Sequence, residues 1–170
     1  MIRWLGAILV AGATTAAGLA AAQRLGARVR LLSAFAHALD IMQSEISFNL
    51  TPLPDLMALL VHRAAAPARP FFAHCARLMK KLGDYSFHTL WQKAVSDIGP
   101  EWRTGERDTL MDLGAVLGRY DHQAQARALT LAKSRMEALL LKAESERARQ
   151  SRVFGTLGVA CGLAIVIILI

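Results

Sequence analysis

The sequence predicts an all-α fold: an antiparallel bundle of about six helices between two transmembrane helices. The 170 residues are 54% apolar but only 6% aromatic, a composition that favours helices over strands. Apolar residues recur every three or four positions along most of the chain, and no run alternates long enough to form a strand. Two uncharged segments, 4–22 and 153–170, have about the length that a helix needs to cross a bilayer.

The segment 153–170 is predicted to be the second transmembrane helix. It carries no charged residue, and at about 1.5 Å per residue a helix of this length crosses most of a hydrocarbon core of roughly 30 Å. Gly155, Gly158 and Gly162 lie on one side of this helix. Their spacing would allow another span to pack closely against it.

The segment 4–22 is uncharged but consists mostly of Ala, Gly and Thr. A cleaved signal peptide is the alternative, since Arg3 precedes the segment and three alanines end it. The product would be a secreted domain anchored at its C-terminal end. Arg24, Arg28 and Arg30 follow directly and would resist translocation. We therefore expect a retained first transmembrane helix.

Basic residues flank both ends of the segment 23–152, which lies between the predicted spans. Lys142, Arg147, Arg149 and Arg152 stand at its end. Positive charge beside a span predicts that this helical bundle is cytoplasmic. The net charge of +7 then reflects attraction to an anionic lipid bilayer. Nucleic acid is not expected as a partner, because charges of both signs mix along the last predicted helix.

The first helix of the bundle is predicted to continue from the first span to about residue 48. Its apolar stripe consists of Leu25, Val29, Leu32, Phe35, Leu39, Met42 and Ile46. The stretch NLTPLPDLMALL then turns the chain into a second helix. Thr51 is the predicted N-cap, Pro52 suits the first helical position, and Pro54 falls in the first turn.

Prolines and glycines mark the boundaries of the third and fourth helices. Pro67 and Pro70 end the second helix, and the third runs to about Gly83. Ser86 is the predicted N-cap of the fourth helix, which ends at the Gly-Pro pair 99–100.

The fifth helix is predicted to end at Gly118, and the sixth to begin at the N-cap Asp121. Between Asp121 and Gly155 the sequence contains neither proline nor glycine. The sixth helix should therefore continue without a break into the second span.

No catalytic residue, metal site or cofactor is predicted. The five histidines, His37, His62, His74, His88 and His122, are spread over separate predicted elements and do not show metal-ligand spacing. Cys75 has apolar neighbours, which is typical of an inert core thiol, and no glycine-rich phosphate loop is present. A membrane-bound hydrolase that uses Cys75 or His88 is the alternative.

Four segments follow one another in a distinctive order: LGAILVAGATTAAG near the start, EISFNLTPLP after the first long helix, LGRYDHQAQ before the last, and TLGVACGLAIVIILI at the end. Together they resemble the stage III sporulation protein AB family over essentially the whole chain. The resemblance implies a bacterial sporulation protein in the mother cell membrane around the forespore, within a secretion-like complex that links the two cells.

The resemblance also implies partners. The bundle is similar to the cytoplasmic domains of platform proteins in type II secretion and type IV pilus machines, which associate with a motor ATPase. The expected partners are the stage III sporulation ATPase AA, other membrane subunits of the complex, and further copies of this chain in a homo-oligomer.

We therefore expect a non-enzymatic scaffold that works through protein–protein interaction. The candidate contact residues stand before the second helix and at the start of the last: Thr51, Pro52, Pro54, Asp55, Asp121 and Gln125. The plainer interpretation is that both groups only cap helices.

Overall fold

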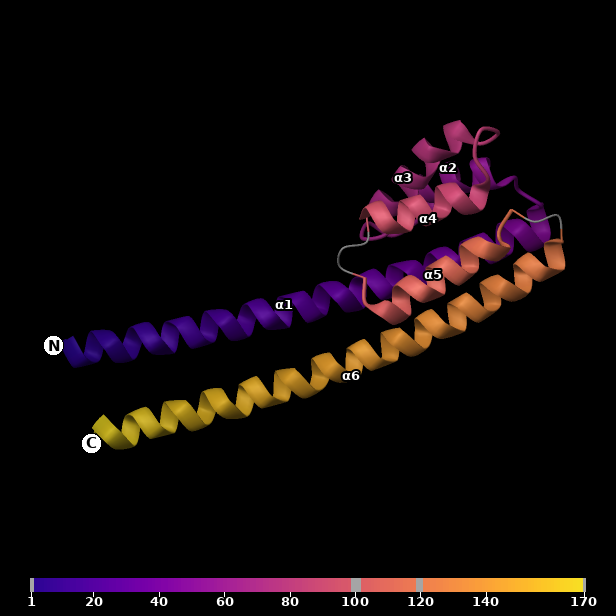
Figure 1. Ribbon diagram of the computed structural model, residues 1–170. Coiled ribbons are helices and arrows are strands. Elements are labelled where there is room, and N and C mark those ends of the chain that lie inside the picture. Colours follow the sequence, from indigo (N-terminus) through magenta and orange to yellow (C-terminus); the bar gives the residue numbers. More distant parts are fainter. Residues whose placement is uncertain (1, 99–101, 119–120, 170) are drawn as a thin grey trace. The chain divides into compact units, whose positions relative to one another are not determined.

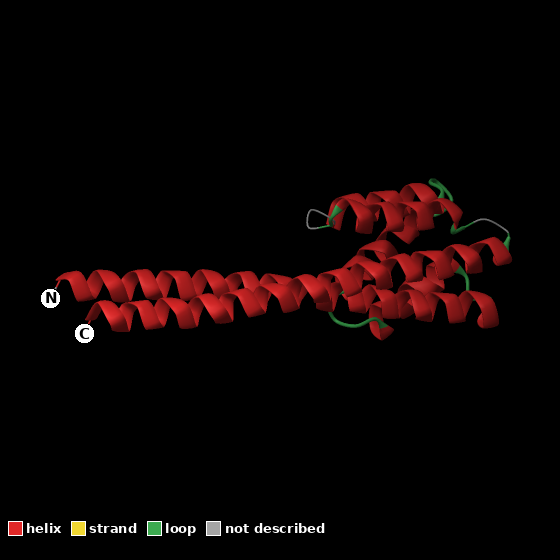
Figure 2. Ribbon diagram, turned by 90° about the horizontal axis from the view of Figure 1, so that it is seen from below, coloured by secondary structure: helices red, strands yellow, loops and turns green. Residues whose placement is uncertain are grey.

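The computed structural model describes the backbone over residues 2–98, 102–118 and 121–169, and side chains over 20, 23–97, 102–118, 121 and 123–150. Within these ranges the chain forms helices joined by short turns and contains no β-strand (Figures 1 and 2). The α-helices are α1 (Ile2–Ser44), α2 (Leu53–Arg63), α3 (Arg69–Leu78), α4 (Phe87–Ile98), α5 (Thr104–Val116) and α6 (His122–Leu169). The all-α prediction is confirmed.

The chain divides into two compact units. Arg30–Leu140 form the first, which we call the helical unit and which contains α2 to α5 with the adjoining parts of α1 and α6. Met1–Val29 and Leu141–Ile170 form the second, which combines the start of α1 with the end of α6. Among the residues of this second unit whose side chains are described, Gly26 and Ala143 are buried.

Among the residues whose side chains are described, no helix is both long enough and apolar enough to cross a membrane. Apart from Ala20, the predicted spans 4–22 and 153–170 lie outside those residues, and so do Gly155, Gly158 and Gly162. The two spans and their packing glycines therefore stay predictions.

Two of the predicted helix caps are confirmed. The Oδ1 atom of Asp121 accepts hydrogen bonds from the backbone N–H groups of Gln123 and Ala124, at 2.9 and 3.2 Å. The Ser86 hydroxyl accepts the N–H of Thr89 at 3.2 Å, one residue before α4. After Asp121, α6 runs without interruption to Leu169, as the absence of proline predicts.

The predicted cap at Thr51 is wrong. α2 begins at Leu53, its N-cap position is Pro52, and no side chain caps it. A side chain at position 51 would cap the N–H groups two or three residues later, and Pro54 has no N–H to offer. The Thr51 hydroxyl instead donates to the carboxylate of Glu45, at 2.9 Å.

The core of the helical unit is built around aromatic rings. Phe71 packs edge-on against Phe35 and Trp91, with ring centroids 5.3 and 5.2 Å apart. The indole N–H of Trp91 donates to the backbone carbonyl of Leu110, at 2.7 Å. Gly114, on the next turn of α5, leaves the space that the indole ring fills. These contacts join α1, α3, α4 and α5 into one body.

Candidate functional site

The turns that precede α2 and α6 lie at one end of the helical unit (Figure 1). The amide of Gln43 donates to the Thr130 hydroxyl at 3.1 Å, and Lys133 forms an ion pair with Asp40. Because the residue numbers rise along α1 while they fall along α6, the two helices are antiparallel. The end of α1 therefore lies beside the beginning of α6.

The turn between α3 and α4 lies at this same end. A Cβ atom added to Gly118, just after α5, would lie 3.0 Å from the Cβ of Phe87, the first residue of α4. The turn that precedes Phe87 is therefore adjacent to the turn that follows α5. We call the surface formed by residues 45–55, 79–86, 117–118, 121 and 123–125 the turn end.

All the contact residues predicted from the sequence belong to the turn end: Thr51, Pro52, Pro54, Asp55, Asp121 and Gln125. The structure thus brings together two groups that are far apart in the sequence. Pro52, Asp55 and Asp121 are exposed, and Thr51 and Pro54 are half-buried. Gln125 is only 6% exposed, which leaves little of its side chain for a partner.

A buried carboxylate organises the first turn of this surface. Glu45 opens a π-helical turn, Glu45–Asn49, and is only 7% exposed. It accepts hydrogen bonds from the Asn49 amide at 2.8 Å, the Thr51 hydroxyl at 2.9 Å and the Arg63 guanidinium at 3.0 Å. Its charge is therefore satisfied by three donors, one of which comes from the far end of α2.

The same contacts lower the pKa of Glu45. The hydrogen bond from Asn49 has the largest effect, followed by that from Thr51, and the charge of Arg63 adds to both. Partial burial acts in the opposite direction but is outweighed. Glu45 therefore stays ionised, which keeps it an acceptor for all three donors.

Apolar side chains project from the turns that the polar groups hold in place. Phe48 is 84% exposed and Leu50 is 61% exposed, and Leu82 and Tyr85 are exposed in the turn before α4. These are four of the six large apolar side chains that are exposed in the described part of the chain. Sequence reasoning placed residue 48 at a helix end and missed the exposure of Phe48. Its absence from the apolar stripe of the first helix was the available signal.

Leu50 has a backbone conformation that is unusual for a large residue. Its φ of 51° and ψ of 33° lie in the left-handed region. This position, directly after a helix, is most often occupied by glycine. The N–H groups of Leu50 and Thr51 both bond to the carbonyl of Glu45 and fix this geometry.

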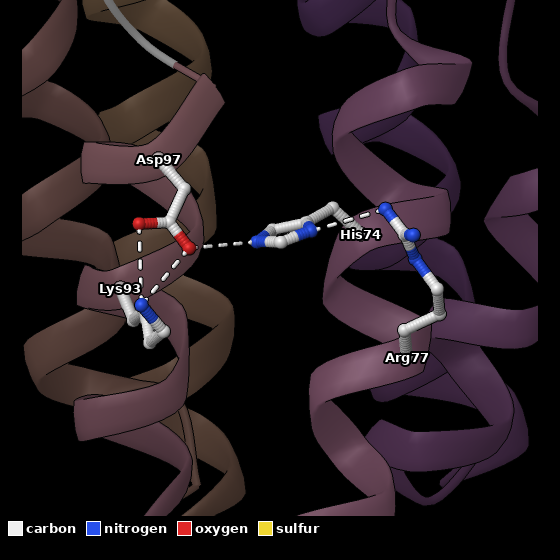
Figure 3. A network of polar contacts seen from close by, with 4 residues as sticks. All are labelled: His74, Arg77, Lys93 and Asp97. Carbon is white, nitrogen blue, oxygen red and sulfur yellow. Dashed lines mark hydrogen bonds and ion pairs between the residues drawn. The ribbon is translucent and has the colours of Figure 1, made fainter.

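A second polar network joins α3 to α4 (Figure 3). His74 lies between Asp97, 3.0 Å from its Nε2 atom, and Arg77, 3.2 Å from its Nδ1 atom. Lys93 completes the network with an ion pair to Asp97. The hydrogen bond from His74, and then that from Lys93, lower the pKa of Asp97. Each polar group has a partner within the network, which is typical of side chains that hold two helices together.

The alternative hydrolase would use Cys75 or His88, and the two residues lie in different surroundings. Cys75 is fully buried, and burial raises the pKa of its thiol, which disfavours the nucleophilic thiolate. Its neighbour His74 contacts Asp97, near the end of α4, whereas His88 lies in the first turn of that helix. Asp97 and His88 are therefore roughly 13 Å apart along α4. Nothing places the imidazole of His88 beside the Cys75 sulfur.

The fold and the order of segments can now be compared with known proteins. The family model described as stage III sporulation protein AB matches residues 3–170. Stage III sporulation protein AB of Bacillus subtilis (strain 168) is 27% identical over 174 residues, which cover 99% of each chain. A solved structure described as stage III sporulation protein AB matches with a TM-score of 0.64 and 24% identity. The match covers 70% of this chain and 94% of that one, and it shows a shared fold.

The family match extends over nearly the whole sequence, and the curated relative has almost the same length. The structural match agrees with the helical architecture described above. The chain belongs to the stage III sporulation protein AB family.

Proposed function

We propose that this sporulation protein is a membrane-anchored, non-enzymatic platform subunit. It would belong to a secretion-like complex that links mother cell and forespore, and would dock the stage III sporulation ATPase AA through the turn end. The observation that carries the proposal is the gathering of exposed apolar side chains in turns at one end of the helical unit. Apolar surface of this kind is a mark of protein–protein contact.

The proposed location is the mother cell membrane around the forespore, with two spans and the helical unit in the cytoplasm. Arg24 and Arg30 are exposed on α1, and Arg147 and Arg149 are exposed on α6. Exposed guanidinium groups beside a span favour the cytoplasmic side and attract anionic lipid. Other membrane subunits would pack against the spans, at the glycines of the second one.

A platform function explains the polar networks around Glu45 and His74 better than catalysis does. The buried carboxylate of Glu45 is saturated by donors, and the imidazole of His74 is held between two partners. Neither group is left available to activate a water molecule or a substrate. Such groups shape a surface instead.

Site-specific photocrosslinking in sporulating cells tests the proposal. The chain would replace the host's own stage III sporulation protein AB and carry a photoreactive amino acid at position 55 or 121. Both positions are exposed in the turn end. Position 131, exposed on α6 outside the turn end, is the matched control. We expect the ATPase to be captured from positions 55 and 121 and not from position 131.

Two results would overturn the proposal. One is the absence of ATPase from every turn-end crosslink. The other is digestion of the helical unit by a protease added outside intact protoplasts, because this would place the unit on the wrong side of the membrane.

A further inference from the structure

We propose that one segment of the turn end, residues 45–51, is the docking element, and that Phe48 and Leu50 insert together into an uncharged apolar pocket on the ATPase. We call this segment the Phe48 turn. The inference rests on the proposed function and deepens it, because it names the side chains that bind and the chemistry of the surface that receives them.

The Phe48 turn is rigid before any partner arrives. Three side-chain donors hold the Glu45 carboxylate, and two of them, Asn49 and Thr51, belong to the turn itself. Two backbone N–H groups hold the Glu45 carbonyl. The last residues of the segment are thus hydrogen-bonded to its first residue, Glu45. A preformed knob loses little conformational entropy on binding, which raises affinity.

The two side chains at the tip of this rigid turn are apolar and largely exposed. Phenylalanine and leucine lose contact with water when a partner covers them, and burial of each side chain favours binding. A monomeric helical unit gains nothing from this arrangement. A partner with a matching pocket would gain the whole effect.

The charges on and next to the Phe48 turn favour a protein pocket over an anionic lipid surface as the occupant. Glu45 is the one charged residue of this segment, and its carboxylate is paired with Arg63 of α2 at 3.0 Å, so the two charges offset each other. The next charged residue along the chain, Asp55, is acidic and exposed. A membrane-binding turn would need exposed cations beside its apolar tip. The turn before α4 differs, since Lys80 and Lys81 are exposed there. The Phe48 turn therefore matches a protein pocket without strong charge.

The backbone of Leu50 gives independent support. A left-handed conformation is unfavourable for a non-glycine residue, and glycine or asparagine would avoid most of that cost. Strained residues of this kind are concentrated at functional sites. Leucine contributes a large apolar side chain at this position, which glycine and asparagine lack.

Binding measurements with purified full-length chain in detergent and purified ATPase AA test the inference. The variants are Phe48→Ala and Leu50→Asn, with Leu131→Gln as the matched control for an exposed leucine outside the turn end. We expect each turn variant to weaken binding about tenfold or more, as central apolar anchors do, and the control to change it less than twofold. Asparagine tolerates the left-handed backbone, so Leu50→Asn tests the side chain without unfolding the turn.

The other outcomes of the binding measurements distinguish failure of the proposed function from failure of the inference alone. If the unaltered chain does not bind the ATPase, the proposed function fails, and the inference fails with it. If the unaltered chain binds and both turn variants bind equally well, the inference alone is overturned. It is also overturned if the variants reduce binding to vesicles of anionic phospholipid or change the oligomeric state of the chain while ATPase binding persists.

Discussion

The Trp91 core and the Phe48 turn arrange the same kinds of group in opposite ways. In the core a large aromatic side chain is buried, and its N–H is satisfied by a backbone carbonyl. In the turn a carboxylate is buried and satisfied by three donors, while the aromatic ring of Phe48 is exposed. The first arrangement stabilises the unit by removing apolar surface from water. The second uses polar contacts to present apolar surface to water.

This difference separates residues that hold the fold together from residues that shape a surface. Changes around Trp91 should affect stability most, because close-packed cores tolerate neither cavities nor added atoms. Changes in the Phe48 turn should have smaller effects on stability, and their consequences should appear in binding. Measured free energies of unfolding can test this order.

The largest effect is expected from Gly114→Ala. The added Cβ would lie 2.1 Å from the Cδ1 atom of Trp91, and the indole ring is fixed by its hydrogen bond to Leu110. We expect a loss of about 3 kcal/mol, measured by urea unfolding of the full chain in detergent. Gly105→Ala is the control, because its Cβ would meet the flexible end of Leu139 at 3.4 Å. Equal stability of the two variants would contradict the close packing at Trp91.

The next effect concerns acid stability. Because the folded state lowers the pKa of Glu45, its contacts stabilise the fold above the usual glutamate pKa of 4.5, and this contribution is lost as pH falls through the folded-state pKa. We expect unfolding free energy to fall in acid, and to fall less steeply in Glu45→Gln. Asp97→Asn is the parallel variant, since the pKa of Asp97 is also lowered. If the unfolding free energy falls equally in acid for the unaltered chain and for Glu45→Gln, the ionised carboxylate contributes nothing to stability.

The contrast between the two regions also explains which structural features can be predicted from the sequence. The caps at Ser86 and Asp121 and the unbroken α6 follow from local rules, because each depends on residues within one turn. The full set of donors to Glu45 does not follow from such rules. One of them, Arg63, lies 18 residues from Glu45 in the sequence and contacts it only in the folded unit. The sequence accordingly predicts a cap at Thr51, whereas its hydroxyl donates to the Glu45 carboxylate.

The turn end likewise depends on contacts between residues that are far apart in the sequence. The two groups of candidate contact residues stay predictions drawn from turn and cap chemistry, but their assembly at one end follows only from the antiparallel pairing of α1 with α6. Phe48 and Leu50 were missed because periodicity identifies side chains that are buried and is silent about those that are exposed. Leucine gives no sequence signal of a left-handed backbone either.

A smaller effect is expected from Thr51→Val. The substitution keeps the shape of the side chain and removes one of the three donors to the Glu45 carboxylate. Hydrogen bonds to charged groups contribute about 1.5 kcal/mol or more, so we expect a loss of that size in urea unfolding. The loss should be smaller in the Glu45→Gln background, where the amide oxygen still accepts the hydrogen bond but carries no charge. An equal loss in both backgrounds would mean that Thr51 acts through packing alone.

The smallest effect is expected at Leu50, and its sign distinguishes a shaped surface from a packed one. Leu50→Asn relieves the left-handed backbone and removes little buried surface, so we expect a gain of about 0.5 kcal/mol in unfolding free energy. Leu50→Val keeps an apolar side chain but adds β-branching, which a positive φ tolerates poorly, so it should lose stability. If leucine were placed there for packing, asparagine would be the more damaging change. A stability ranking of Asn above Leu above Val would show that the fold bears a cost to keep leucine at this position, since residues selected for stability alone would not.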